Sequence, residues 1–200
     1  MRLLPFLFSL ALLAQPTPEF TFGTTVSSSA GLEGKIYLLD PFTELLPRFN
    51  PKKSVGSIYT TSLNVPVQSF DRGFPGITNR FEWFAIDYTG KFWVETPGVY
   101  AFNLLSDDGS KLWIDDRLLI DNDGIHPPAA LTASARFSRG AYRIRVAYFQ
   151  GPRTTIALVL SVRPPEQPWR IFRTDDFLPP ATEATWTPGK ISDFKRAANR

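Results

Sequence analysis

Short runs in which apolar and polar residues alternate limit the folds open to this chain. In residues 142–148 tyrosine, isoleucine and valine alternate with arginine and alanine, and residues 156–162 repeat the pattern with isoleucine, leucine and valine. Successive side chains of a β-strand point to opposite faces, so such a run buries one face and leaves the other in water. Between the runs lie many of the 18 prolines and 13 glycines. The pattern predicts an all-β protein, an antiparallel β-sandwich of jelly-roll-like form.

The same pattern predicts further strands elsewhere in the chain. Thr89-Gly90 and Pro97-Gly98 are expected to be turns, because glycine tolerates the backbone conformations that turns require. Residues 40–79 show no sustained period and are expected to form long loops with one or two short strands. No run of useful length has the period of a helix. We expect strands at residues 34–38, 81–88, 92–94, 99–105, 111–115 and 118–120.

The N-terminal residues are interpreted as a targeting segment rather than as part of the fold. Arg2 is followed by an almost wholly apolar run that ends near Ala14. This order of a positive residue, an apolar stretch and a small residue is typical of a secretory signal peptide. Residues 1–14 are therefore expected to be removed from a secreted protein, and residues 15–30, rich in proline, threonine and serine, to form a linker. No later run is apolar enough to span a bilayer, so no transmembrane segment is expected in the mature chain.

The remaining sequence divides into one domain and one extension. The alternating runs end at residue 163, so a single domain is expected at residues 31–163. Residues 164–200 contain several prolines and a basic end, and are expected to form an irregular C-terminal extension. Trp169, Ile171 and Phe172 are apolar enough to dock on the sandwich as an edge segment.

Composition excludes several classes of function. With no cysteine, the chain has no disulfides and no thiolate metal site. The net charge of +3 is small and the charges are dispersed, so nucleic acid is not an expected partner. A single histidine provides no histidine pair for a metal, and neither a phosphate-binding glycine loop nor a nucleophile elbow is present. The chain is therefore not expected to be an enzyme.

Four segments carry a resemblance to a known family. Residues 98–115 contain the block Asp-Asp-Gly-Ser followed by Leu-Trp-Ile-Asp, and residues 119–126, 140–150 and 31–37 extend the match. Together they resemble the PA-fourteen family, the β-sandwich domain named after the toxin protective antigen. This domain also occurs in fungal flocculins and adhesins, in some glycosidases and in bacterial secreted proteins. The resemblance covers roughly residues 31–163 and implies a carbohydrate-associated binding domain.

The resemblance also implies a site. In the adhesin branch of the family, two adjacent aspartates bind calcium through a cis peptide, and the ion holds sugar hydroxyls. The matching residues here are Asp107 and Asp108, with Gln150 where the adhesins have asparagine and Gly151 beside it as a further ligand-binding position. Neighbouring strand residues point to opposite faces, so the two carboxylates can share an ion only if the backbone between them is cis or sharply kinked. The residues alone also allow a tight turn in which Asp107 caps backbone amides and Gly109 adopts a positive φ.

Other oxygen-rich or aromatic positions have two interpretations each. Residues 121–124 could hold calcium, but they lack the spacing of an EF-hand loop and are expected to form a polar hairpin loop. His126, followed by two prolines, is expected to pack within a loop. Core positions are expected for Trp113 and Tyr148, whereas Trp83 and Trp93 remain candidates for stacking on a sugar.

Two functions fit these observations. The first is a secreted, calcium-assisted module that binds a glycan or polysaccharide. The second is a structural or adhesive module that binds another protein of the cell envelope without sugar or metal. A calcium-dependent thermal shift distinguishes them, because only the first needs an ion between Asp107 and Asp108.

Overall fold

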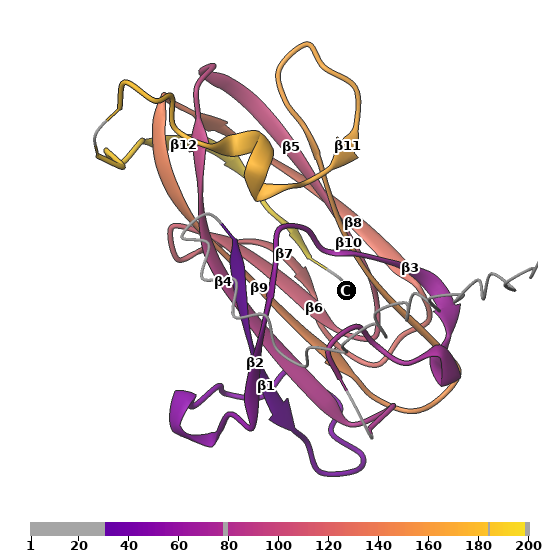
Figure 1. Ribbon diagram of the computed structural model, residues 1–200. Helices are drawn as coiled ribbons and strands as arrows, with labels where there is room; N and C mark the ends of the chain where they lie inside the picture. Colours follow the sequence, from indigo (N-terminus) through magenta and orange to yellow (C-terminus); the bar gives the residue numbers. More distant parts are fainter. Residues whose placement is uncertain (1–30, 78–79, 184, 199–200) are drawn as a thin grey trace, which may run out of the picture.

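The computed structural model describes residues 31–77, 80–183 and 185–198, which form two β-sheets packed face to face (Figure 1). The larger sheet has seven strands, in the order β13 (Ala197–Ala198), β7 (Arg117–Asn122), β6 (Ser110–Ile114), β9 (Gly140–Gln150), β4 (Phe84–Val94), β1 (Leu32–Leu38) and β2 (Gly56–Thr60). The other has six, in the order β11 (Arg170–Ile171), β10 (Thr155–Arg163), β5 (Gly98–Asp107), β8 (Ala129–Phe137) and β12 (Ile191–Lys195), with β3 (Asn64–Ser69) paired to β10. Three short 3-10 helices complete the elements, η1 (Pro51–Lys53), η2 (Phe70–Arg72) and η3 (Thr174–Phe177). The predicted all-β sandwich is confirmed.

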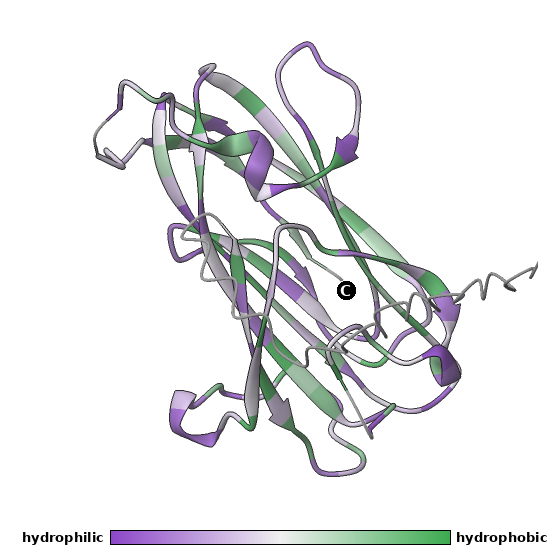
Figure 2. Cartoon of the chain, viewed as in Figure 1, coloured by the Kyte–Doolittle hydropathy of each residue, from purple (hydrophilic) through white to green (hydrophobic). Residues whose placement is uncertain are grey.

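The core lies between the two sheets. Each central strand sends alternate side chains inward, as its sequence pattern predicts. The long strands β4 and β9 pair along their whole length, from Phe84 opposite Gln150 to Val94 opposite Gly140. In Figure 2 apolar segments recur along these strands, whereas the connecting loops are mostly polar. Inward-facing side chains that are fully buried include Phe84, Ile86, Phe92, Phe102, Leu104, Ile144, Val146, Leu158 and Leu160.

The turn expected at Thr89-Gly90 is wrong, because β4 runs unbroken from Phe84 to Val94. Gly90 serves close packing instead. A Cβ atom there would lie 2.7 Å from Leu32 Cδ2 and 2.9 Å from the Gly31 carbonyl oxygen. The glycine thus lets the start of β1 lie against β4.

The C-terminal residues are more closely built into the sandwich than an irregular extension would be. β11 pairs with the edge of β10, as expected for the segment around Ile171, and Phe172 is buried. Phe177 of η3 is also buried and stacks on Phe172 with ring centroids 5.2 Å apart. Farther on, β12 pairs with β8, and β13 pairs with β7 in parallel. Residues 164–198 therefore supply both core side chains and sheet edges.

A second, smaller apolar cluster covers part of the outer face of the larger sheet. Tyr37, Leu39, Ala85 and Phe149 are its buried members, and loop residues such as Phe49 pack on them. The ring of Tyr37 meets that of Phe49 edge-on with centroids 5.0 Å apart. This cluster fixes the loop that follows β1 close to the end of β9, next to the candidate site.

The expected signal peptide (1–14) and linker (15–30) lie outside the described residues. Within the described ranges, none of the helices has the length and apolar character that a membrane span requires.

Candidate functional site

Asp107 and Asp108 lie at the connection between β5 and β6, at one end of the sandwich. β5 ends at Asp107 and β6 begins at Ser110, in opposite sheets. The peptide bond between Asp107 and Asp108 is cis, as the family resemblance implied. Both residues are only 3% exposed, which is unusual for aspartates. The chain thus crosses between sheets through a buried acidic pair.

The loop that joins β9 to β10 holds the Asp108 carboxylate, and Thr155, the first residue of β10, holds that of Asp107. The Thr155 hydroxyl donates to Asp107 Oδ2, and the Gly151 backbone N–H donates to Asp108 Oδ2 at 2.8 Å. The His126 backbone N–H donates to the other Asp108 oxygen at 3.2 Å. Because Gly151 and Thr155 lie four positions apart, both carboxylates contact the same short segment of the chain.

Both carboxylates are buried, and neither has a lysine or arginine partner among the described residues. Burial raises the pKa of Asp107, and burial together with the neighbouring Asp107 charge raises the pKa of Asp108 to about 6. Across the described residues, no lysine or arginine forms an ion pair with either carboxylate. Buried carboxylates are normally paired or bound to a metal, because the unpaired charge is costly. The pair is therefore a fitting place for a cation with oxygen ligands.

Calcium fits the chemistry of these donors. It takes oxygen from carboxylates, backbone carbonyls and water, and the two adjacent carboxylates would supply the charged oxygens of such a set. No cluster of three or more histidine, cysteine, aspartate or glutamate side chains occurs in the part of the chain that the structure describes. An ion at Asp107 and Asp108 would therefore complete its shell with loop carbonyls and water.

Gln150 is oriented differently from the expectation for a metal ligand. Its amide nitrogen donates to the backbone oxygens of Thr155 at 3.1 Å and Pro152 at 3.4 Å, and lies 3.5 Å from Asp108 Oδ2. Its amide oxygen accepts from the Tyr148 hydroxyl at 2.6 Å. Since carbonyls and carboxylates only accept, the nitrogen must face them. In this arrangement Gln150 braces the loop and does not offer its oxygen to an ion.

Three buried polar side chains next to the acidic pair form a hydrogen-bonded network. The hydroxyls of Ser106 and Ser110 lie 2.6 Å apart, and the Asn122 amide nitrogen donates to Ser106 at 3.0 Å. All three side chains are fully buried. Sequence inspection did not single them out, although the two serines flank the Asp-Asp-Gly motif symmetrically. The network links β5, β6 and β7 at the point where the chain changes sheets.

Gly109 is needed for space rather than for a positive φ, so the expected reason was wrong. A Cβ atom on Gly109 would lie 2.3 Å from Phe149 Cε1 and 2.9 Å from an Asp123 carboxylate oxygen. We expect Gly109→Val to destabilise the fold by about 1–3 kcal/mol, as overpacking of a tight site does. Urea denaturation measures this. Gly56→Val is the matched control, since a Cβ at that position would meet only Ile36 at 3.9 Å; equal effects of the two changes would contradict the packing argument.

The polar hairpin loop expected at residues 121–124 is wrong: Asp121 and Asn122 end β7, and the chain then crosses through residues 123–128 to β8 in the other sheet. Asp123 accepts from the Leu46 backbone N–H at 2.9 Å and pairs with Lys111 at 2.9 Å. Gly124 has a φ of +116°. His126 packs within the same loop, its two ring nitrogens lying 2.9 and 3.0 Å from backbone carbonyl oxygens. These groups shape the rim of the acidic pair.

Two of the four aromatic positions, Trp93 and Trp113, differ from the expectation. Tyr148 is buried in the core, as predicted, and Trp93 is also buried, which removes it as a stacking platform. Trp83 is partly buried and lies 6.0 Å from the ring of Phe42. The core position expected for Trp113 is wrong, because this side chain lies partly exposed on the outer face of the larger sheet. An inward-facing Leu112 takes the core position beside it.

Comparison with solved structures places the fold among known ones. An anti-sigma factor domain-containing protein is similar with a TM-score of 0.60 at 20% identity, over 78% of this chain and 51% of that chain. The PA14 sugar-binding domain from an RTX adhesin gives 0.55 at 16%, over 72% and 96%. The epithelial adhesin 9 A domain from Candida glabrata, in complex with Galβ1-4GlcNAc, gives 0.51 at 14%, over 74% and 88%. This chain thus spans about half the length of the first protein and most of the other two.

The comparison with protein families agrees with the structural one. No curated protein sequence gives a significant match. The model of the PA14 domain matches residues 53–172, more than half of the chain, and includes the acidic pair, the β9–β10 loop and the buried Phe172. On this match and the two-sheet fold, the chain belongs to the PA14 domain family.

Proposed function

We propose that this protein is a secreted, non-catalytic module that binds a glycan at the Asp107–Asp108 end of the sandwich, with calcium as the bridging ion. The observation that carries the proposal is the buried acidic pair, which faces a loop and has no cationic partner among the described residues. Family membership supports a carbohydrate-binding type of module. The similar RTX adhesin domain is described as sugar-binding, and the similar Candida glabrata domain is bound to a disaccharide.

Hydrogen bonds within the chain already orient the two carboxylates. The backbone N–H groups of Gly151 and His126 fix the orientation of the Asp108 carboxylate, and the Thr155 hydroxyl fixes that of Asp107. Gln150 ties the loop to the core through Tyr148. When bound, calcium would neutralise the two carboxylates and offer open coordination positions to sugar hydroxyls. Because the carboxylates are held in place before an ion binds, less conformational entropy would be lost on binding.

A calcium titration tests the ion. Saturating calcium at about 100 times its dissociation constant should stabilise the folded protein by about 2.7 kcal/mol, seen as a rise in melting temperature. Asp107→Asn keeps the shape of the side chain but removes a charge, so we expect it to abolish most of this rise. Asp175→Asn is the control, because Asp175 lies exposed on η3, which packs against Tyr100, seven positions before Asp107 on β5. A calcium-induced rise that survives Asp107→Asn would rule out this ion site.

A glycan array tests the ligand. Wild-type protein should bind at least one glycan in calcium, and chelator or Asp107→Asn should remove that signal. Sugars replace water at such sites with little net gain, so weak binding is expected and a multivalent display is needed. If no glycan signal depends on calcium, the protein-binding adhesive alternative takes precedence.

A further inference from the structure

A row of side chains crosses the outer face of the larger sheet, away from the acidic pair. The strand register places Tyr59 of β2 opposite Glu33 of β1, Glu33 opposite Thr89 of β4, and Thr89 opposite Arg145 of β9. Arg145 in turn lies opposite Trp113 of β6. With strands about 4.8 Å apart, the row is about 19 Å long. It begins and ends with an aromatic side chain and is polar between them.

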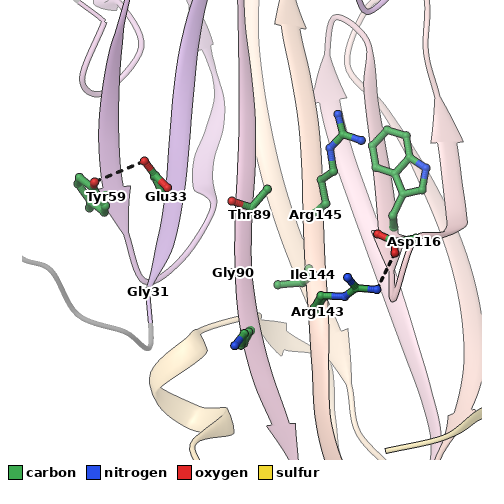
Figure 3. A pocket seen from close by; sticks show the side chains of 11 residues that line it. Gly31, Glu33, Tyr59, Thr89, Gly90, Asp116, Arg143, Ile144 and Arg145 are labelled. Carbon is green, nitrogen blue, oxygen red and sulfur yellow. Dashed lines mark hydrogen bonds and ion pairs between the residues drawn. The ribbon is translucent and has the colours of Figure 1, made fainter. Parts of the chain in front are cut away.

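This row lines a groove of about 600 Å³ (Figure 3). Lys91, Arg143 and Asp116 line it as well. In Figure 3 the Tyr59–Glu33 and Arg143–Asp116 interactions are drawn as dashed lines on the two sides of the groove. The volume lies within the range of about 300–1,000 Å³ that small-ligand sites occupy.

The groove is separate from the proposed calcium site. Arg145 and Gln150 lie on the same strand, five positions apart, which corresponds to about 16 Å at about 3.3 Å per residue. The acidic pair contacts Gln150 and the loop beyond it, whereas the groove begins at Arg145. A ligand in the groove would therefore need no ion.

We propose that this groove is a second, calcium-independent binding site for an uncharged oligosaccharide that lies across the strands. The apolar faces of sugar rings suit the aromatic side chains of Tyr59 and Trp113 at its two ends. Sugar hydroxyls both donate and accept, and the middle of the row offers an acceptor in Glu33, a hydroxyl in Thr89 and a donor in Arg145. Charge-assisted hydrogen bonds of this kind are the stronger ones.

The indole of Trp113 is held in place for such a role. The Arg145 guanidinium lies 4.7 Å from the centre of the Trp113 ring, and Asp87 fixes the guanidinium through bonds of 2.6 and 3.2 Å. The Trp113 ring thus contacts Arg145, which Asp87 holds in place before any ligand arrives. Tyr59, at the other end, donates weakly to Glu33 at 3.5 Å.

The charges of the groove favour an uncharged occupant. Lys91, Arg143 and Arg145 supply positive charge, while Glu33 in the middle and Asp116 at the side supply negative charge. A polyanion would meet Glu33 directly. The Arg143–Asp116 pair is exposed, with side-chain exposures of 63% and 79%, so its strength is small and ligand hydroxyls can replace it.

A peptide is a poorer occupant than a sugar. Peptides that add to a sheet use the free backbone groups of an edge strand. The floor of this groove is formed by β1, β4, β9 and β6, each paired on both sides in the sheet. A peptide lying across these strands would find side chains but no backbone ladder.

The test is a glycan array carrying neutral and anionic oligosaccharides, probed in EDTA so that the calcium site cannot contribute. The strongest neutral oligosaccharide is then titrated by calorimetry, also in EDTA. We expect Trp113→Ala and Tyr59→Ala each to weaken binding about tenfold or more. Trp169→Ala is the matched control, because Trp169 is exposed next to β11 on the other sheet. Tyr59 lies on an edge strand and half exposed, so its variant keeps the test valid if Trp113→Ala fails to fold.

The outcomes separate this site from the proposed function. Neutral-glycan binding that persists in EDTA and is lost in both groove variants supports the groove, whether or not calcium binds at Asp107. Three results would overturn it: no neutral glycan bound in EDTA, binding only to anionic glycans, or neutral binding unchanged by both substitutions.

Discussion

Replacing Phe92 by alanine is expected to reduce the free energy of unfolding by about 3–5 kcal/mol, the usual cost of deleting a buried phenylalanine ring. Phe92 is fully buried at the centre of the aromatic part of the core. Its ring centroid lies 5.5–6.4 Å from five other rings, those of Phe102, Phe137, Tyr142, Phe172 and Phe177. These rings come from both sheets and from η3, so no single element can move to fill the cavity.

Urea denaturation measures this loss directly. Phe42→Ala is the control, because Phe42 is 86% exposed and its removal should change stability by no more than about 0.5 kcal/mol. The slope of the unfolding free energy against urea should stay similar, since both variants unfold the same surface. A loss below about 1 kcal/mol for Phe92→Ala would mean that the aromatic core is packed much more loosely than these ring distances indicate.

The alternating pattern predicted most strands because their inward side chains are large. The pattern failed where the packing of side chains, rather than their alternation, determines the structure. β8 was missed because its inward positions include Ala133 and Ala135, which are buried but too small to mark a pattern. Glycine favours turns, so the sequence predicts one at Thr89-Gly90, but a glycine within a strand also allows another backbone to approach closely, as β1 does here.

The candidate site was predictable only in part. A local motif, Asp-Asp-Gly, identified Asp107 and Asp108, and the resemblance supplied the cis bond that the structure has. The orientation of the Gln150 amide depends on carbonyls of a loop that a motif does not describe. The groove was invisible for a similar reason: Tyr59 and Trp113 are 54 positions apart in the sequence, and only the register of five strands aligns them.

Removing residues 164–200 is expected to abolish cooperative folding, although the alternating pattern ends at Arg163. The deletion takes away two buried rings, Phe172 and Phe177, which stack on each other and pack on Phe92. Each ring lost costs about 3–5 kcal/mol, and together they approach the total stability of about 5–15 kcal/mol of an ordinary domain. The deletion also uncovers the edges of β8 and β7, where β12 and β13 pair.

Circular dichroism during heating, with near-ultraviolet spectra to follow the aromatic packing, measures the outcome. The truncated chain should show no sharp transition and a weak near-ultraviolet signal. Two point variants in the full chain separate the contribution of the buried ring from that of an exposed one. Phe172→Ala should reduce the free energy of unfolding by about 3–5 kcal/mol. Trp169→Ala, three residues earlier and exposed, should remain close to the wild type. A truncated chain that melts cooperatively near the wild-type temperature would show that residues 31–163 fold alone. Because Phe172 closes the core against Phe92 and Phe102 in this structure, with ring centroids 5.6 and 6.2 Å away, we expect the opposite.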